Sequence, residues 1–152
     1  MSQKTLSTQQ TMSMGETAVD GLLAGLVGGG VMALFLLTAG WLAGAPPLTT
    51  LAYFDPAQTG SWLTGLLAHL AVAAIYGVGF GLLIGVVGRL RSSALRGLWL
   101  WGMGYGLALW LLGLGVVLTA VGAPLAQIPA WQFALAHVVY GGVLGFWLGK
   151  HQ

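Results

Sequence analysis

Two histidines in apolar surroundings are the residues of this sequence best suited to chemistry. His69 and His137 each lie in a long apolar segment, and a tyrosine follows each of them, Tyr76 and Tyr140 respectively. Ionisable side chains inside membrane segments are rare and usually face the interior of a bundle, and a buried tyrosine hydroxyl needs a hydrogen-bond partner. We therefore take these four residues as the candidate cofactor-binding residues.

Three roles for the histidines are compatible with the sequence. A neutral imidazole can donate a hydrogen bond to a neighbouring helix and so hold the bundle together. It can also be an axial ligand of a haem or a chlorin, although a macrocycle ligated from both sides needs its two helices held apart. The third role is proton handling or hydrogen bonding to a quinone.

Rows of glycine follow both histidines along their segments. The rows are Gly77, Gly81 and Gly85 after the first histidine, and Gly141, Gly145 and Gly149 after the second. Residues four apart share one face of a helix, and a face without side chains lets another backbone approach closely. We expect segments 62–88 and 130–149 to form a tight inner pair through these glycines, with the other two segments outside. A flat glycine face holding a planar molecule is the alternative.

The elements that carry these residues are membrane helices. The chain is 57% hydrophobic and only 5% charged, whereas about a quarter of a soluble domain is charged. Its apolar segments cover residues 18–43, 62–88, 97–121 and 130–149. Each has the ~20 residues needed to cross a bilayer, where the backbone must satisfy its own hydrogen bonds. We predict an all-α fold, a polytopic membrane four-helix bundle, in which residues 18–150 form one transmembrane domain behind a flexible tail at 1–17.

The bundle is expected to consist of two tandem parallel helical hairpins. The pattern Tyr-Gly-x3-Gly-x3-Gly that begins at Tyr76 recurs at Tyr140, and the Gly-Ala-Pro turn at 44–46 recurs at 122–124. Both matches occur in the same order, which indicates a duplication with halves at about 18–90 and 93–150.

Charge placement predicts the orientation. Lysines and arginines occur at Lys4, Arg89, Arg91, Arg96 and Lys150, and none lies in the links at 46–61 and 122–129. Because positive residues are retained on the cytoplasmic side, we expect both termini there. The first apolar segment is too long for the core of a cleavable signal peptide. In the outer link, the run from Tyr53 to Pro56 indicates a turn, with Asp55 able to cap the segment that follows.

Several classes of activity are not expected. The chain has no cysteine, and it contains no phosphate-binding loop, no HExxH motif and no pair of carboxylates within the apolar cores. We therefore expect neither catalytic residues nor a metal site. The basic residues are few and dispersed, which argues against nucleic acid as a partner. Membrane lipid, other membrane subunits and further copies of the chain are the expected partners.

The pattern resembles a group of small bacterial four-helix inner-membrane proteins of unknown function. The resemblance is carried by His69 followed by Tyr76 and Gly77, by the Gly-Ala-Pro-Leu turn at 122–125, and by the final segment from His137 to Gly145. It implies a multi-pass protein of the bacterial inner membrane, and it implies no activity.

The leading hypothesis is a non-catalytic membrane subunit or scaffold that packs through its glycine faces, within a larger respiratory or photosynthetic complex or with itself. One alternative is an electron-transfer subunit that binds a tetrapyrrole or a quinone through His69 and His137. The other is a small oligomeric transporter or channel.

Overall fold

Four long helices dominate the computed structural model, which describes residues 13–46, 48–90, 97–117 and 124–150. The long helices are α1 (Met14–Leu42), α3 (Trp62–Leu90), α4 (Leu98–Leu112) and α6 (Ala130–Lys150). The short elements are α2 (Thr49–Ala52), the π-helical η2 (Gly113–Val117) and the 3-10 turn η3 (Leu125–Gln127). These described ranges contain no strand, and the predicted all-α four-helix membrane bundle is confirmed.

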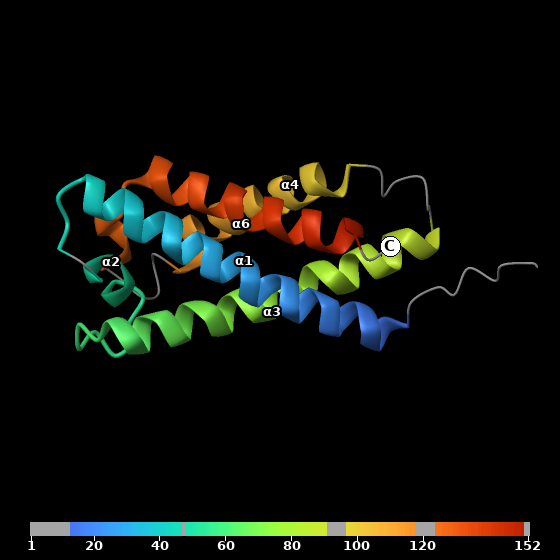
Figure 1. The fold of residues 1–152 in the computed structure, drawn as a ribbon, viewed down its shortest axis with the longest axis horizontal. Helices are drawn as coiled ribbons and strands as arrows, with labels where there is room; N and C mark the ends of the chain where they lie inside the picture. Colours follow the sequence, from blue (N-terminus) through green and yellow to red (C-terminus); the bar gives the residue numbers. More distant parts are fainter. Residues whose placement is uncertain (1–12, 47, 91–96, 118–123, 151–152) are drawn as a thin grey trace, which may run out of the picture.

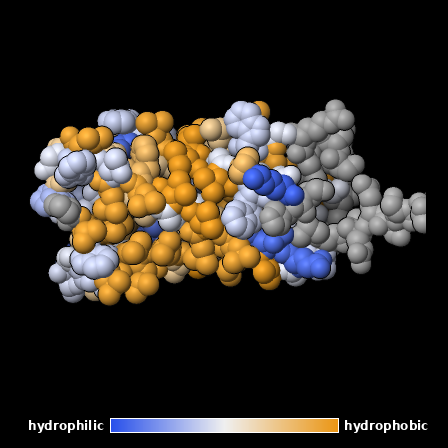
Figure 2. All heavy atoms as spheres, viewed as in Figure 1, coloured by the Kyte–Doolittle hydropathy of each residue, from blue (hydrophilic) through white to orange (hydrophobic). Residues whose placement is uncertain are grey.

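The surface of the bundle suits a lipid environment. Helices α1, α3 and α6 have the length and apolar composition of a membrane span, and so does α4 together with the start of η2, over Leu98–Gly115. Large apolar side chains such as Ile75 and Leu34 point outward, with 68% and 65% of their surface exposed. Figure 2 shows apolar residues over the middle of the bundle and more polar residues toward both ends. The protein is therefore a multi-pass membrane protein.

Helix α1 begins at Met14, four residues earlier than predicted. Ser13 and Glu16 form a capping box, in which the Ser13 backbone donates to the Glu16 carboxylate at 2.7 Å and the Glu16 backbone donates to the Ser13 hydroxyl at 3.2 Å. The prediction of a tail up to residue 17 is wrong at this end, because the cap starts the helix before the apolar run begins. Residues 1–12 lie outside the described residues, as do 118–123, where the third span was expected to end.

The helices pack in the order α3, α1, α6, α4. Figure 1 shows α1 between α3 and α6, with the start of α1 and the ends of α3 and α6 at one end of the bundle and α2 at the other. The predicted tight inner pair of the second and fourth spans is wrong. The inner pair consists of the first and fourth spans, and α3 and α6 make little backbone contact with each other.

The glycine rows explain this order, because each row meets its match within its own hairpin. A Cβ on Gly77 would run into the carbonyl of Gly21, and one on Gly141 would run into the carbonyl of Gly102. Gly81 makes a similarly close contact with the backbone of α1, and Gly145 makes one with the backbone of α4. Gly85 faces the Thr17 side chain, and Gly149 faces Leu98. All six glycines therefore pack inside the chain.

Helices α3 and α4 stand at the two ends of this row and leave a seam between them. Within their described parts the two backbones do not pack closely. Side chains cross the gap: the Tyr105 hydroxyl donates to the Tyr76 carbonyl at 2.9 Å, and the Tyr105 ring lies 4.9 Å from that of Phe80.

Candidate functional site

A cavity of about 280 Å³ lies between α3 and α6 near the ends that face α2, and we call it the histidine cavity. His69, Tyr76, His137 and Tyr140 all line it. The structure thus brings together the four residues that sequence reasoning singled out. They meet although α3 and α6 scarcely touch, because the cavity occupies the space between these helices.

The rest of the lining is mainly apolar. Met32 of α1, Leu109 of α4 and Leu125 of η3 contribute side chains, and Val72 stands at the rim with 49% of its surface exposed. Helix α4 widens into the π-helical η2 at Gly113, which also lines the cavity. Insertions of this kind often adjoin functional sites. The cavity offers a hydrophobic enclosure with few polar groups, which is the usual composition of a small-molecule site.

His69 is fixed by its neighbour across the first hairpin. It is 8% exposed, and its Nε2 atom lies 3.1 Å from the carbonyl oxygen of Gly29 on α1. A carbonyl can only accept a hydrogen bond, so Nε2 carries the proton. In the neutral ring Nδ1 is then an acceptor.

His137 is fixed by its own helix. Its Nδ1 atom lies 2.8 Å from the carbonyl oxygen of Phe133, one turn earlier in α6. Nδ1 therefore donates, and Nε2 of the neutral ring is left as an acceptor. The acceptor nitrogen is thus Nδ1 in His69 and Nε2 in His137.

The two tyrosines differ in what their hydroxyl groups do. Tyr140 is 2% exposed, and its hydroxyl donates to the Ala73 carbonyl on α3 at 2.6 Å, which links the two halves of the bundle. Within the described part of the chain, the Tyr76 hydroxyl has no hydrogen-bond partner. Tyr76 can therefore donate a hydrogen bond to a molecule in the cavity, whereas Tyr140 already has an acceptor.

Two phenylalanines that sequence reasoning missed complete the cavity. The Phe54 ring lies 4.9 Å from His69 and 6.2 Å from Phe133, and the Phe133 ring lies 4.6 Å from His137 at an interplanar angle of 89°. The four rings form a row across the cavity. A signal for Phe133 was present, since the repeat that aligns Tyr76 with Tyr140 also aligns His69 with Phe133. Nothing in the sequence indicates that Phe54 turns inward.

Asp55 holds the loop that carries Phe54. Its Oδ1 accepts from the backbone of Ala57 at 3.1 Å, and its Oδ2 accepts from the backbone and hydroxyl of Thr59 at 2.9 and 2.7 Å and from the backbone of Ser61 at 3.2 Å. The hydrogen bond from the Thr59 hydroxyl is the main cause that holds the pKa of Asp55 below its ordinary value. The carboxylate organises the turn, as the sequence indicated, and is 2% exposed.

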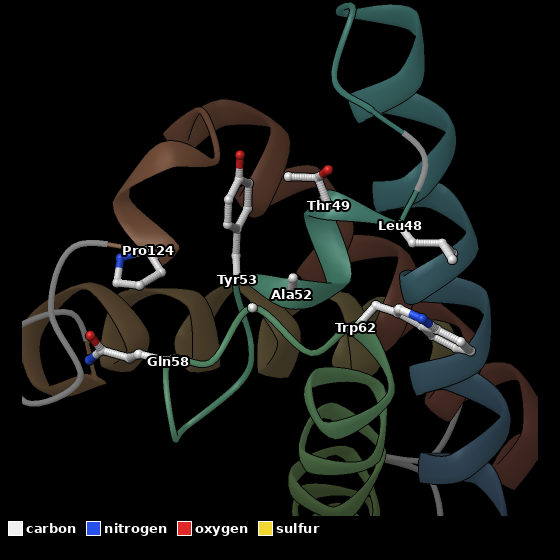
Figure 3. Close-up of a pocket in the computed structure, with 8 residues that line it drawn as sticks. Leu48, Thr49, Ala52, Tyr53, Gln58, Trp62 and Pro124 are labelled. Atoms are coloured by element: carbon white, nitrogen blue, oxygen red, sulfur yellow. The ribbon is translucent and has the colours of Figure 1, made fainter.

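A second hollow of about 440 Å³ lies in the loops beside this turn. Figure 3 shows Leu48 and Trp62 on its α1 side and Gln58 and Pro124 on the opposite side, with Tyr53 standing between them. Among the described residues that line this hollow, Tyr53 has the only titratable side chain. Among the described residues, the histidine cavity thus has more titratable side chains in its lining than this hollow has.

Comparisons of the chain with family models, with curated proteins and with solved structures give no match. The functional argument therefore depends on the site itself.

The size of the histidine cavity limits the group that it can hold. Pockets for drug-sized ligands begin at about 300 Å³, and a tetrapyrrole macrocycle is larger than such ligands. A backbone carbonyl bonded to one imidazole nitrogen would orient the other toward a metal, but the cavity volume of about 280 Å³ is small for a haem or a chlorin. Among the described residues, no three His, Cys, Asp or Glu side chains are grouped as metal ligands. A single aromatic ring suits the enclosure better.

Proposed function

We propose that the protein is an integral membrane subunit that binds the head group of a quinone or hydroquinone in the histidine cavity. The observation that carries this proposal is the meeting of two histidines and two tyrosines around one mainly apolar cavity. His69 and His137 each keep an acceptor nitrogen, and Tyr76 keeps its donor. Tyr140 already donates its hydrogen bond to the Ala73 carbonyl and braces the wall.

The hydrogen-bonding groups fit both redox forms of such a ring. A hydroquinone hydroxyl can donate to Nδ1 of His69 or to Nε2 of His137, since each neutral ring has one acceptor nitrogen. A quinone carbonyl can accept from the Tyr76 hydroxyl. The apolar walls and the phenylalanine rings accommodate the ring faces, where offset or tilted aromatic contacts are favourable.

The glycine faces favour this proposal over a pure scaffold. Packing against another subunit through the glycine rows needs free glycine faces, and here α1 and α4 cover them. Contacts with other subunits would use the exposed apolar side chains, such as those of Ile75 and Leu34. Membership of a larger complex remains part of the proposal, and purification in a mild detergent followed by native mass spectrometry tests it. A protein that always purifies alone as a monomer would contradict it.

Binding can be tested with a tail-free dimethoxybenzoquinone and its hydroquinone. We expect the wild type to bind them in nanodiscs, and Tyr76→Phe to weaken quinone binding by about 0.5–1.5 kcal/mol, the usual net value of one hydrogen bond. Tyr76→Phe leaves the protein's own hydrogen bonds intact. His137→Phe should weaken hydroquinone binding, and the matched control is His151→Phe, because His151 is the third histidine of the chain. Equal affinity in all variants, or no binding by the wild type, would contradict the proposal.

The proposed location is the bacterial inner membrane with both termini in the cytoplasm. The distribution of lysine and arginine supports this orientation. Because the chain has no cysteine, single cysteines can report the sidedness. Ala57→Cys in the outer loop should react with an impermeant maleimide in intact cells, and Ser92→Cys should react only after permeabilisation. The opposite result would invert the orientation.

A further inference from the structure

The seam between α3 and α4 contains a third space, which is apolar. This groove of about 530 Å³ is lined by Phe80, Ile84 and Val87 of α3 and by Leu98, Trp101 and Ala108 of α4, among others. Leu83 and Trp101 at its edge have 49% and 60% of their surface exposed, so the groove opens toward lipid. We call it the α3–α4 groove.

The groove lies beside the histidine cavity, further along α3 and α4. On α3 the cavity ends at Tyr76 and the groove begins one turn later at Phe80, and on α4 Leu109 lines the cavity while Ala108 lines the groove. Tyr105 of the groove lining connects the two spaces, because its hydroxyl donates to the carbonyl of Tyr76, which lines the cavity, and its ring contacts that of Phe80. From His69 to Val87 the two spaces extend over roughly 27 Å at 1.5 Å per residue.

The two spaces differ in chemistry. The cavity has four polar side chains around an aromatic enclosure, whereas the described groove lining carries two polar side-chain groups, the Tyr105 hydroxyl and the Trp101 indole N–H. A molecule that fits both must have a polar ring at one end and an unsubstituted hydrocarbon chain at the other. A tail-free ring would leave the groove to lipid.

We infer that the ligand of this site carries a long hydrocarbon tail and that the tail lies in the α3–α4 groove. This inference rests on the proposed function, because the ring in the histidine cavity fixes where the tail begins. The ligand class is a quinone or hydroquinone with a prenyl or alkyl chain. The open side of the groove lets such a molecule enter from the bilayer, with its ring passing Val72 at the rim of the cavity.

A matched pair of glycines provides the test. Gly104 lines the groove, and a Cβ built on it meets no atom within 4 Å. Gly30 on α1 is equally open by the same measure and lines neither the cavity nor the groove. Gly104→Phe therefore adds a ring at the groove from a Cβ that meets no protein atom, and Gly30→Phe makes the same change elsewhere on a membrane helix.

The affinities of the tail-free and decyl-tailed forms of one dimethoxybenzoquinone are measured in nanodiscs for both variants and the wild type. Each affinity is expressed relative to the wild type, because the partition of the tail into lipid is common to all three proteins and cancels. We expect Gly104→Phe to weaken binding of the decyl-tailed form several-fold and to leave the tail-free form unchanged. Gly30→Phe should change neither.

The outcomes separate the two proposals. If both forms bind the wild type and Gly104→Phe has no effect on the decyl-tailed form, the tail inference fails while the proposed function stands. If neither form binds the wild type, both fail.

A photoreactive group at the end of the tail gives an independent readout. Labelling of the peptides that contain residues 80–87 and 98–108 supports the inference. Labelling spread over all four helices, or labelling of the groove that excess phospholipid abolishes, would show that the groove holds lipid and would overturn it.

Discussion

Replacing Gly141 with alanine tests the closest helix contact of the second hairpin. A Cβ at this position would run into the Gly102 carbonyl oxygen and lie 2.7 Å from its carbon and 3.0 Å from the backbone nitrogen of Gly106. All these atoms belong to the backbone of α4, so no side chain can rotate away. The two helices must move apart, and every contact along their interface loosens with them.

The neighbouring residue provides a control for the magnitude. At Gly142 the nearest atoms are Cγ and Cε of Met103, at 3.7 and 3.9 Å, which is ordinary contact with a flexible side chain. Both substitutions gain the same helix propensity, up to about 1 kcal/mol for alanine over glycine. The difference between their free energies of unfolding therefore comes from packing alone. Forcing a methyl group into a filled site costs about 1–3 kcal/mol. We therefore expect Gly141→Ala to be less stable than Gly142→Ala by that amount.

Unfolding in mixed micelles of dodecyl maltoside and sodium dodecyl sulfate measures this difference, with circular dichroism or tryptophan fluorescence as the signal. The transition of Gly141→Ala should occur at a lower mole fraction of sodium dodecyl sulfate than those of the wild type and of Gly142→Ala. Coincident transitions for the two variants would refute the close approach of α4 and α6 and, with it, the pairing order of the helices.

Two further predictions concern the polar groups. Tyr140→Phe removes the 2.6 Å bond to the Ala73 carbonyl and should lower the free energy of unfolding by about 0.6–1.7 kcal/mol, the average and the maximum measured for hydrogen bonds between membrane helices; an unchanged unfolding transition would contradict the bond. The lowered pKa of Asp55 means that the stability it contributes is complete above its ordinary value of 3.8 and is lost as the pH falls through the lowered value. Asp55→Asn should therefore flatten the acid limb of the stability profile, whereas a profile as steep as that of the wild type would show that the carboxylate does not hold the loop.

The sequence predicted the helices well because a membrane imposes a simple requirement on them. A run of about 20 apolar residues must be helical in lipid, so the four spans could be located from composition alone. The partners of each helix were harder to predict. Glycines four apart occur in the first and third spans as well as in the second and fourth, and the spacing identifies a close-packing face without naming the helix that meets it. The wrong choice of inner pair follows from this ambiguity.

The candidate site was predictable in its residues but not in its enclosure. His69 and His137 are conspicuous in the sequence because ionisable side chains in membrane segments are costly and therefore rare. Their tautomers depend on the carbonyl groups of Gly29 and Phe133, which only the folded backbone places. Phe54 closes the cavity from a loop, and its inward direction depends on the hydrogen bonds around Asp55, which a linear pattern does not encode.

The pairing order also determines when the cavity forms. Each hairpin is closed by its own glycines, and the contact between α1 and α6 joins the halves. His69 belongs to the first half and His137 to the second, so no binding site exists until this last contact is made. A ligand that binds only the joined form stabilises it by mass action. A bound ligand would then hold the two hairpins together. Without the ligand, the contact between α1 and α6 would separate more readily.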